Sequence, residues 1–358
     1  MRTAIVHDYL SQRGGAERVV LALSRLFPDA PVYTSFYVPE MTYPEFERLD
    51  VRTSSLQGSV RPDRFRRAVL RFPAAFEGLD LSGFDQVVVS SSAFAHHVRH
   101  PRKLVYCYTP PRFLYDAAAY LGGPLRGAVA RPLLAPLRRR DRRAAATAVR
   151  YAAISEQTAR RVREVYGREA PVIYPPLWTA HLPAEPLPPP ACPRALVIAR
   201  LLPYKRVDVA VRACARAGIG LTVVGEGPEW ARLAKLAGEG ATFLGRVDDA
   251  CMHELFASHS VVLAPGIEDF GYGPLEANFA GRPVVAVAAG GALETVQRGV
   301  NGELVEGWDV DRWAAAIREV LTRTWSPGAL RRTTTRFQAE VFERQLLEWV
   351  AHAPAAGG

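Results

Sequence analysis

Two carboxylates flank a glycine-containing turn in the second half of the chain. Glu268 and Glu276 lie on either side of "GYGP" in the segment "APGIEDFGYGPLEANFAG", directly after the apolar run "SVVLAP". Carboxylates on such a loop can accept hydrogen bonds from sugar hydroxyls, hold a metal ion, or act as general acid and base. The N–H groups of Gly271, Tyr272 and Gly273 can approach phosphate oxygens, because glycine permits a tight backbone path.

A second candidate site is the segment "ARLLPYKRVD". Arg200 ends a predicted strand, and Lys205 precedes the next predicted helix. A guanidinium and an ammonium at this spacing can bind one diphosphate from two sides. The chain has only three lysines, Lys103, Lys205 and Lys235, so we favour this function over two solvated charges.

A glycine pair near the N-terminus is a third, weaker candidate. In "HDYLSQRGGAERVV", Gly14 and Gly15 lie between a predicted strand and a helix whose N-terminus could receive a phosphate. A glycine pair at such a turn is more often structural.

Short apolar, β-rich runs alternate with segments of helical periodicity along the whole chain. The runs in the first half are "TAIVHD", "PVYTSF", "QVVVSSS", "KLVYCYT", "YAAIS" and "PVIYPP". Those in the second half are "RALVIAR", "LTVVGEG", "ATFLGRV", "SVVLAPG", "PVVAVAAG" and "GELVEG". Alternation of this kind predicts an α/β protein with two doubly wound, Rossmann-like domains of parallel strands. Such sheets bind ligands at the carboxyl ends of their strands, where all three candidate segments fall.

A proline-rich segment divides the chain. "LPAEPLPPPACPR" contains six prolines and predicts a stiff linker over residues 181–193. We therefore expect an N-terminal domain over 1–180, a C-terminal domain over 194–335, and an amphipathic helix over 336–352 that packs back on the first domain.

Composition indicates a globular protein, and its net positive charge suits an anionic partner, although a compositional bias toward arginine could explain much of that charge. The 358 residues are 49% hydrophobic and 23% charged, with a formal net charge of +9. Basic residues concentrate between Arg131 and Arg143, where a helix would present either a solvated face, which we favour, or a surface for anionic lipid. No nucleic-acid-recognition motif accompanies the charge.

The N-terminus and the cysteines predict a cytoplasmic protein. "MRTAIVHDYL" leads directly into a strand rather than a signal peptide, and no apolar run approaches the roughly 20 residues of a membrane-spanning helix. The four cysteines lie far apart, and their spacing indicates neither a disulfide framework nor a zinc site. A peripheral position at the inner face of the membrane is the alternative location.

The ordered set of motifs resembles the retaining glycosyltransferases of family 4, which have the GT-B fold. In the second half, "EDFGYGPLE" fits the Glu-x7-Glu signature, accompanied by "ARLLPYKRVD", "VVGEGPE", "FLGRV" and "GGALETV". In the first half, "RGGAERV", "FDQVVVSSSAFAHHV", "CYTPPRF" and "YGREAPVIYPP" resemble the branch that assembles bacterial polysaccharides and glycoconjugates, often from GDP-mannose.

The resemblance implies a role for each candidate residue. Arg200 and Lys205 would neutralise the donor diphosphate, helped by the Gly14–Gly15 turn of the other domain. Glu276 would bind the nucleotide ribose, Glu268 would contact the transferred sugar, and Phe270, Gly271, Tyr272 and Gly273 would hold sugar and phosphate. The base would lie near Arg246 and Val247.

The resemblance also implies the reaction. A hexose would move from a nucleoside-diphosphate sugar, GDP-mannose favoured, to a saccharide, lipid-linked or small-molecule acceptor, with retention at the anomeric carbon. Neither a metal ion nor another cofactor is expected, because fixed positive charge stabilises the departing diphosphate.

One position departs from the family pattern. Relatives commonly have histidine where "CYTPPRF" has Tyr108, which keeps a hydrogen-bonding tip but cannot form an imidazolium. His96 and His97 could supply an imidazole instead, although a pair of surface histidines is the favoured interpretation. Asp8, directly after the first strand, is a weak candidate for the acceptor side together with Tyr108.

Two alternatives remain open from the sequence. The protein could be a non-catalytic partner subunit that binds a sugar nucleotide, or a GT-B sugar-nucleotide epimerase. An epimerase would convert the donor without any acceptor.

Overall fold

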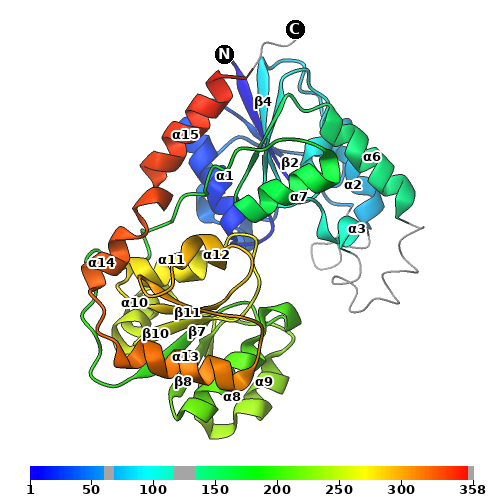
Figure 1. Ribbon diagram of the computed structural model, residues 1–358. Helices are drawn as coiled ribbons and strands as arrows, with labels where there is room; N and C mark the ends of the chain where they lie inside the picture. The colour runs from blue at the N-terminus through cyan, green and yellow to red at the C-terminus, as the bar shows by residue number, and fades with distance from the viewer. Residues whose placement is uncertain (60–67, 117–133, 354–358) are drawn as a thin grey trace. The chain divides into compact units, whose positions relative to one another are not determined.

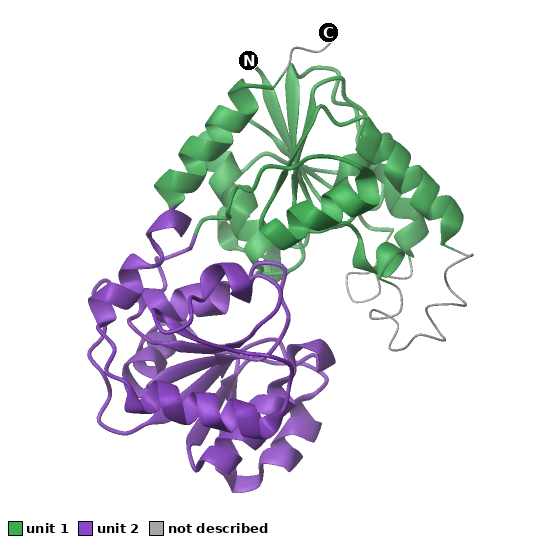
Figure 2. Ribbon diagram, viewed as in Figure 1, with its two compact units in different colours: residues 1–176, 339–358 green, residues 177–338 purple. Residues whose placement is uncertain are grey.

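The computed structural model describes residues 1–59, 68–116 and 134–353, and divides into two compact units (Figures 1 and 2). Unit 1 comprises residues 1–176 and 339–358, and unit 2 comprises residues 177–338. Each unit contains one six-stranded sheet, and every strand pairing is parallel. The predicted α/β class with two doubly wound domains is confirmed.

The strands of unit 1 are in the order β3-β2-β1-β4-β5-β6. They are β1 (Thr3–His7), β2 (Val32–Thr34), β3 (Val51–Thr53), β4 (Gln86–Ser91), β5 (Lys103–Cys107) and β6 (Arg150–Ala153). The described helices are α1 (Gly15–Leu26), α2 (Phe72–Glu77), α3 (Arg112–Tyr115), α6 (Ala135–Ala146), α7 (Glu156–Tyr166) and α15 (Ala339–Ala351). The chain reverses direction across the sheet between β1 and β4, which is the point where such sheets bind ligands.

The strands of unit 2 are in the order β12-β11-β10-β7-β8-β9. They are β7 (Arg194–Ile198), β8 (Gly220–Val224), β9 (Ala241–Gly245), β10 (Val261–Ala264), β11 (Val284–Val287) and β12 (Gly302–Val305). The helices are α8 (Val207–Ala217), α9 (Trp230–Ala237), α10 (Asp249–Ser258), α11 (Tyr272–Phe279), α12 (Ala292–Thr295), α13 (Val310–Thr322) and α14 (Pro327–Arg332). The corresponding reversal lies between β7 and β10.

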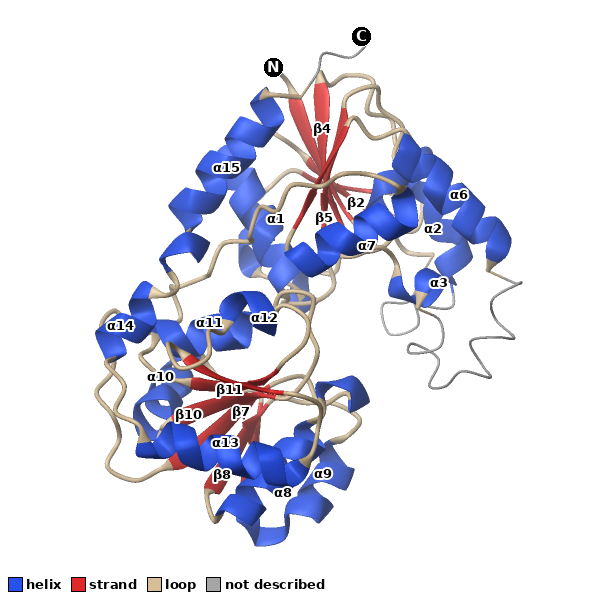
Figure 3. Ribbon diagram, in the orientation of Figure 1, coloured by secondary structure: helices blue, strands red, loops and turns tan. Residues whose placement is uncertain are grey.

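Burial on both faces explains why the central strands are apolar throughout. All six residues of β4 are buried, and so are all four of β11. Helices cover both faces: in unit 2, α8 and α13 lie on one side of the sheet and α11 and α12 on the other (Figure 3). A strand covered on both faces needs no polar alternation, so its sequence is a continuous hydrophobic run.

Local signals place the helix ends. The Ser155 hydroxyl accepts a hydrogen bond from the Thr158 N–H at the start of α7, and Gly167, in the left-handed conformation at φ 64°, ends it. Asp248 and Asp309 cap α10 and α13 in the same way. The last helix, α15, packs within unit 1, where Phe342 contacts Tyr106 with ring centroids 5.8 Å apart.

The proline-rich segment is hydrogen-bonded to other parts of unit 2 along part of its length. The buried Arg282 guanidinium donates to the carbonyls of Leu187 and Pro188, and Arg331 donates to those of Pro183 and Ala184. Proline has no N–H but keeps its carbonyl acceptor, so the segment can serve as a set of acceptors for arginine.

Candidate active site

Arg200 and Lys205 lie on the segment that follows β7. Arg200 is exposed, whereas the Lys205 residue is only 9% exposed, in the short 3-10 helix Pro203–Lys205. Gly266, after the neighbouring strand β10, makes this burial possible: a Cβ at Gly266 would lie 2.9 Å from the Lys205 Cα. The small residue therefore lets the two loops pack backbone against backbone.

Glu268 meets Lys205 at the reversal point of the sheet. Lys205 Nζ lies 2.6 Å from Glu268 Oε1, and 44% of the Glu268 side chain remains exposed. The carboxylate offsets the cost of burying the ammonium. The structure thus brings together two of the residues that the sequence predicts, although they are 63 positions apart in the chain (268 − 205).

The loop between Glu268 and α11 has a fixed path. Gly271 precedes the first residue of α11 with φ 81°, a conformation that glycine adopts without strain. Phe270 is buried and packs on Tyr272 and Phe337, with ring centroids 5.2 and 5.7 Å away. Gly291 lies against the Phe270 backbone and donates its N–H to the Glu268 carbonyl at 2.9 Å. This packing fixes the position of the α11 N-terminus within unit 2.

Glu276 lies in the second turn of α11 and has a partner that the sequence does not reveal. His181 Nε2 is 3.3 Å from Glu276 Oε1, and both side chains are largely buried. The His181 carbonyl in turn contacts His253 Nε2 at 2.8 Å. His181 belongs to the segment predicted as a linker and to none of the motifs, so motif spacing carries no signal for it.

The "GEGP" turn packs against the Arg200 loop. Gly225 and Gly227 have positive φ, and a Cβ on either would lie within 2.3 Å of a backbone oxygen of that loop. Leu201 donates its N–H to the Glu226 carbonyl at 2.8 Å. Arg246 is exposed and Val247 half-buried just after β9. The carboxyl ends of three strands in unit 2 therefore carry the predicted donor-side residues.

In unit 1, Asp8 organises the loop after β4. Its two carboxylate oxygens accept hydrogen bonds from the backbone N–H groups of residues 92–95 and from the Ser92 hydroxyl, at 2.5–3.0 Å. The residue is 1% exposed. Asp8 therefore has a structural task, and its contact with an acceptor stays a prediction.

Tyr108 and the glycine pair lie close to one another. The Tyr108 hydroxyl is 2.9 Å from the Ser90 hydroxyl and donates to the Ala16 carbonyl at 3.2 Å, in the first turn of α1. Gly15 is the first residue of α1, and Gly14 precedes it. Tyr108 is thus tied to the helix that the glycine pair begins.

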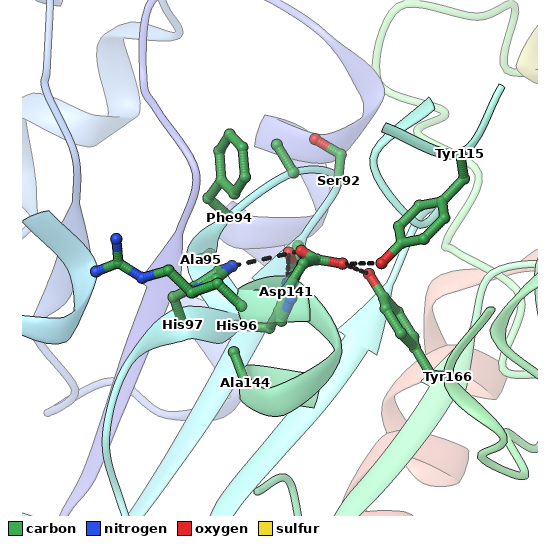
Figure 4. A network of polar contacts seen from close by, with 12 residues as sticks. Ser92, Phe94, Ala95, His96, His97, Tyr115, Asp141, Ala144 and Tyr166 are labelled. Atoms are coloured by element: carbon green, nitrogen blue, oxygen red, sulfur yellow. Dashed lines mark hydrogen bonds and ion pairs between the residues drawn. The ribbon is translucent and has the colours of Figure 1, made fainter. Parts of the chain in front are cut away.

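The interpretation of His96 and His97 as surface histidines is wrong. They are 3% and 2% exposed, because the short helix Ala95–His97 turns them inward against Asp141 of α6 (Figure 4). Burial lowers the pKa of His97. The neighbouring Lys103 is fully buried, with four acceptors within 3.2 Å of its Nζ, and burial lowers its pKa to about 7.

The arginine-rich segment is less cationic at its surface than the sequence predicts. Within α6, Arg138 donates to the Leu114 carbonyl and Arg140 pairs with Glu77 at 2.8 Å, whereas Arg139 and Arg143 are exposed. Residues 131–133 lie outside the described residues. No helix in the described part of the chain is long and apolar enough to cross a membrane.

Comparison with known proteins identifies a domain in unit 2. Residues 192–323 match the family described as Glycosyl transferases group 1. The chain is similar to D-inositol 3-phosphate glycosyltransferases: it is 37% identical over 147 residues to that of Mycobacterium marinum and 35% identical over 156 residues to that of Mycolicibacterium smegmatis. These alignments cover 37% and 40% of this chain, and 31% and 35% of the relatives. The aligned region thus spans about a third of the length of these relatives.

Solved structures resemble the whole described fold. The complex of Anabaena HepE with UDP and glucose has a TM-score of 0.71 at 19% identity and covers 98% of this chain and 100% of its own. Sucrose-phosphate synthase from Thermosynechococcus elongatus has a TM-score of 0.74 at 17% identity, with 98% of each chain covered. Residues 192–323 thus match a glycosyl transferase family, and the described fold is of the GT-B type.

Proposed function

We propose that the protein is a retaining glycosyltransferase that moves a hexose from a nucleoside-diphosphate sugar to an acceptor hydroxyl. The contact between Lys205 and Glu268 carries the proposal, because it places a buried ammonium beside a half-exposed carboxylate at the reversal point of the sheet. The match of residues 192–323 to a glycosyl transferase family supports the same reaction class.

The donor diphosphate is assigned to Arg200 and Lys205. An exposed guanidinium and a buried ammonium on one loop supply charge-assisted hydrogen bonds to its oxygens. Glu276, held by His181, accepts hydrogen bonds from the ribose hydroxyls, and Glu268 accepts them from the transferred sugar. The α11 N-terminus adds backbone N–H groups and the positive end of the helix dipole.

The bond changes we propose are those implied by the resemblance to retaining glycosyltransferases. The acceptor oxygen attacks the anomeric carbon on the face from which the nucleoside diphosphate departs. The bond from the anomeric carbon to the phosphate oxygen breaks with its electron pair, and that oxygen takes the acceptor proton. Arg200 and Lys205 stabilise the charge that develops on the leaving diphosphate.

The donor we favour is GDP-mannose, on the resemblance of the first half of the chain to mannose-using relatives. UDP-glucose is the second candidate, because the HepE structures hold UDP, UDP-glucose, or UDP with glucose. These two donors differ in both base and sugar. A panel that includes GDP-mannose, GDP-glucose, UDP-glucose and UDP-galactose therefore separates recognition of the base from recognition of the sugar.

We propose a cytoplasmic location, and peripheral contact of α6 with anionic lipid is the alternative to a solvated helix face. The exposed Arg139 and Arg143 of α6 provide the charge for that contact.

Release of the nucleoside diphosphate, measured with each donor and a panel of saccharide, lipid-linked and small-molecule acceptors, tests the proposal. We expect acceptor-dependent release with one donor, and NMR of the product should give the same anomeric configuration as the donor. Conversion of the donor sugar without acceptor would instead indicate an epimerase. Nucleotide binding without turnover for any pair would favour a non-catalytic subunit.

A further inference from the structure

Unit 1 contains a buried polar cluster that includes none of the predicted donor-side residues. His96 and His97 come from the short helix after β4, and Asp141 comes from α6 (Figure 4). All three residues are at most 3% exposed, and one ligand atom from each lies within 4.8 Å of those of the other two. Because the two segments are 44 positions apart, the fold alone assembles this set (141 − 97).

The two imidazoles approach the same carboxylate oxygen. His96 Nε2 lies 3.1 Å and His97 Nε2 3.4 Å from Asp141 Oδ1. Atoms that bind one zinc ion tetrahedrally at 2.0–2.1 Å are separated by roughly 3.3 Å. The two separations from Asp141 Oδ1 therefore suit ligands of one ion.

Hydrogen bonding accounts for only part of the arrangement: His97 Nε2 lies within hydrogen-bond distance of Asp141 Oδ1, at 3.4 Å. His96 Nε2 is buried and has no hydrogen-bond partner among the described residues, although it lies so close to the carboxylate. A buried polar atom left in this way costs about 1–3 kcal/mol. A cation between the imidazoles and the carboxylate would use this lone pair.

We propose that His96, His97 and Asp141 form a binding site for a divalent transition-metal ion of the zinc class. Two imidazole nitrogens and one carboxylate oxygen are ligands that such ions accept. A water molecule completes the coordination. Since all three side chains are buried, the ion would stabilise the fold and would not contact a sugar substrate.

Groups around two of the three ligands, His96 and Asp141, hold them in the orientation that a metal requires. Ligating histidines commonly donate their second ring nitrogen to an oxygen acceptor, and ligating carboxylates are themselves hydrogen-bonded. His96 Nδ1 is 3.3 Å from the Ser91 hydroxyl, whereas His97 Nδ1 is 3.6 Å from a Glu77 carboxylate oxygen, which is beyond hydrogen-bond distance.

The second oxygen of Asp141 is likewise held. The hydroxyls of Tyr115 and Tyr166 donate to Asp141 Oδ2 at 2.7 and 2.9 Å, from the side opposite the histidines in Figure 4. Oδ1 thereby faces the two histidines, where the ion would lie.

An ion at this site would stabilise the loop of residues 92–95. Residues 92–95, whose N–H groups Asp8 binds, lead directly into His96 and His97. An ion at the cluster would join this loop to α6, so its removal should loosen the carboxyl edge of the unit 1 sheet.

Elemental analysis of the full chain, prepared without a histidine tag, tests the proposal. The protein is stripped with a chelator, equilibrated with Zn²⁺ or Co²⁺, and desalted. We expect about one equivalent retained, and a rise in the melting temperature that saturates at one equivalent. The Co²⁺ form should show visible bands of nitrogen and oxygen ligation without a thiolate charge-transfer band, which excludes binding at the exposed Cys192.

His96→Gln and His97→Gln should abolish retention, whereas His352→Gln, at an exposed position just after α15, should retain the ion. Substoichiometric retention by the wild type with no change in melting temperature would overturn the proposal, whether or not the variants fold. Stoichiometric retention that survives both cluster substitutions would overturn it equally.

Discussion

Replacing Gly291 by alanine should disrupt the loop between Glu268 and α11, which we assign to the donor, while leaving the two sheets folded. An added Cβ would lie 2.0 Å from the Phe270 carbonyl oxygen and 2.4 Å from its carbon. Ordinary contact begins at 3.4 Å, so the Phe270 backbone must move by about 1.4 Å (3.4 − 2.0). That backbone lies between Glu268 and α11, and a shift of this size moves both away from the donor.

Two effects set the expected losses of stability and of rate: overpacking at Gly291 and displacement of the residues assigned to the donor. Overpacking a tight site costs about 1–3 kcal/mol of unfolding free energy. A displacement of about 1 Å in a group that positions substrate lowers the rate about 100-fold. Urea unfolding measures the first effect, and release of the nucleoside diphosphate measures the second.

Gly240→Ala is the matched control, because Gly240 has no atom within 4 Å of an added Cβ and no positive φ. It should leave both measurements near wild type. If Gly291→Ala has wild-type stability and a wild-type rate, the close packing of Gly291 on the Phe270 backbone is refuted. If the variant loses stability but keeps the wild-type rate, only the role of this loop in sugar transfer is refuted.

Three further predictions concern other parts of the chain. Asp8→Asn should lower the unfolding free energy by about 2–4 kcal/mol, because five hydrogen-bond donors lose a buried carboxylate. Asp29→Asn, at an exposed position, should leave the unfolding free energy unchanged. Equal stabilities of the two variants in urea would contradict this prediction. Burial lowers the pKa of His259 below its usual 6.5, so the unfolded chain takes up the proton first, and stability falls as the pH drops through 6.5. His259→Gln should flatten this dependence, and an unchanged slope in urea titrations would count against it. Arg139→Ser combined with Arg143→Ser should reduce co-sedimentation with anionic vesicles, most clearly at low salt, and wild-type co-sedimentation by the double variant would reject α6 as the lipid contact.

Periodicity and motif order predict the sheets and the proximity of Lys205 to Glu268. The run "QVVVSS" is the strand β4, and the alternation of strands with helices identifies two parallel sheets. The proximity of Lys205 and Glu268 follows from the rule that carboxyl ends of parallel strands share one edge. These features depend on local pattern and on topology, which a single sequence contains.

The buried polar cluster could not be predicted in the same way. Asp141 lies within a run of arginines, which indicates a solvated helix face, yet α6 turns this residue inward against His96 and His97. The contact of His181 with Glu276 likewise joins a proline-rich segment to a distant helix. Such contacts depend on the tertiary packing of segments whose spacing carries no motif.

Calorimetric titration with GDP, UDP, ADP and dTDP tests the central claim most directly. The account predicts that one nucleotide binds, and that Lys205→Met weakens its affinity by about 10- to 150-fold, the equivalent of about 1.5–3 kcal/mol for a charged hydrogen bond. Glu276→Gln should also weaken binding. Lys235→Met, at an exposed position in α9, should bind as the wild type does. Absence of binding for all four nucleotides, or equal affinity of the wild type and Lys205→Met, would contradict the account.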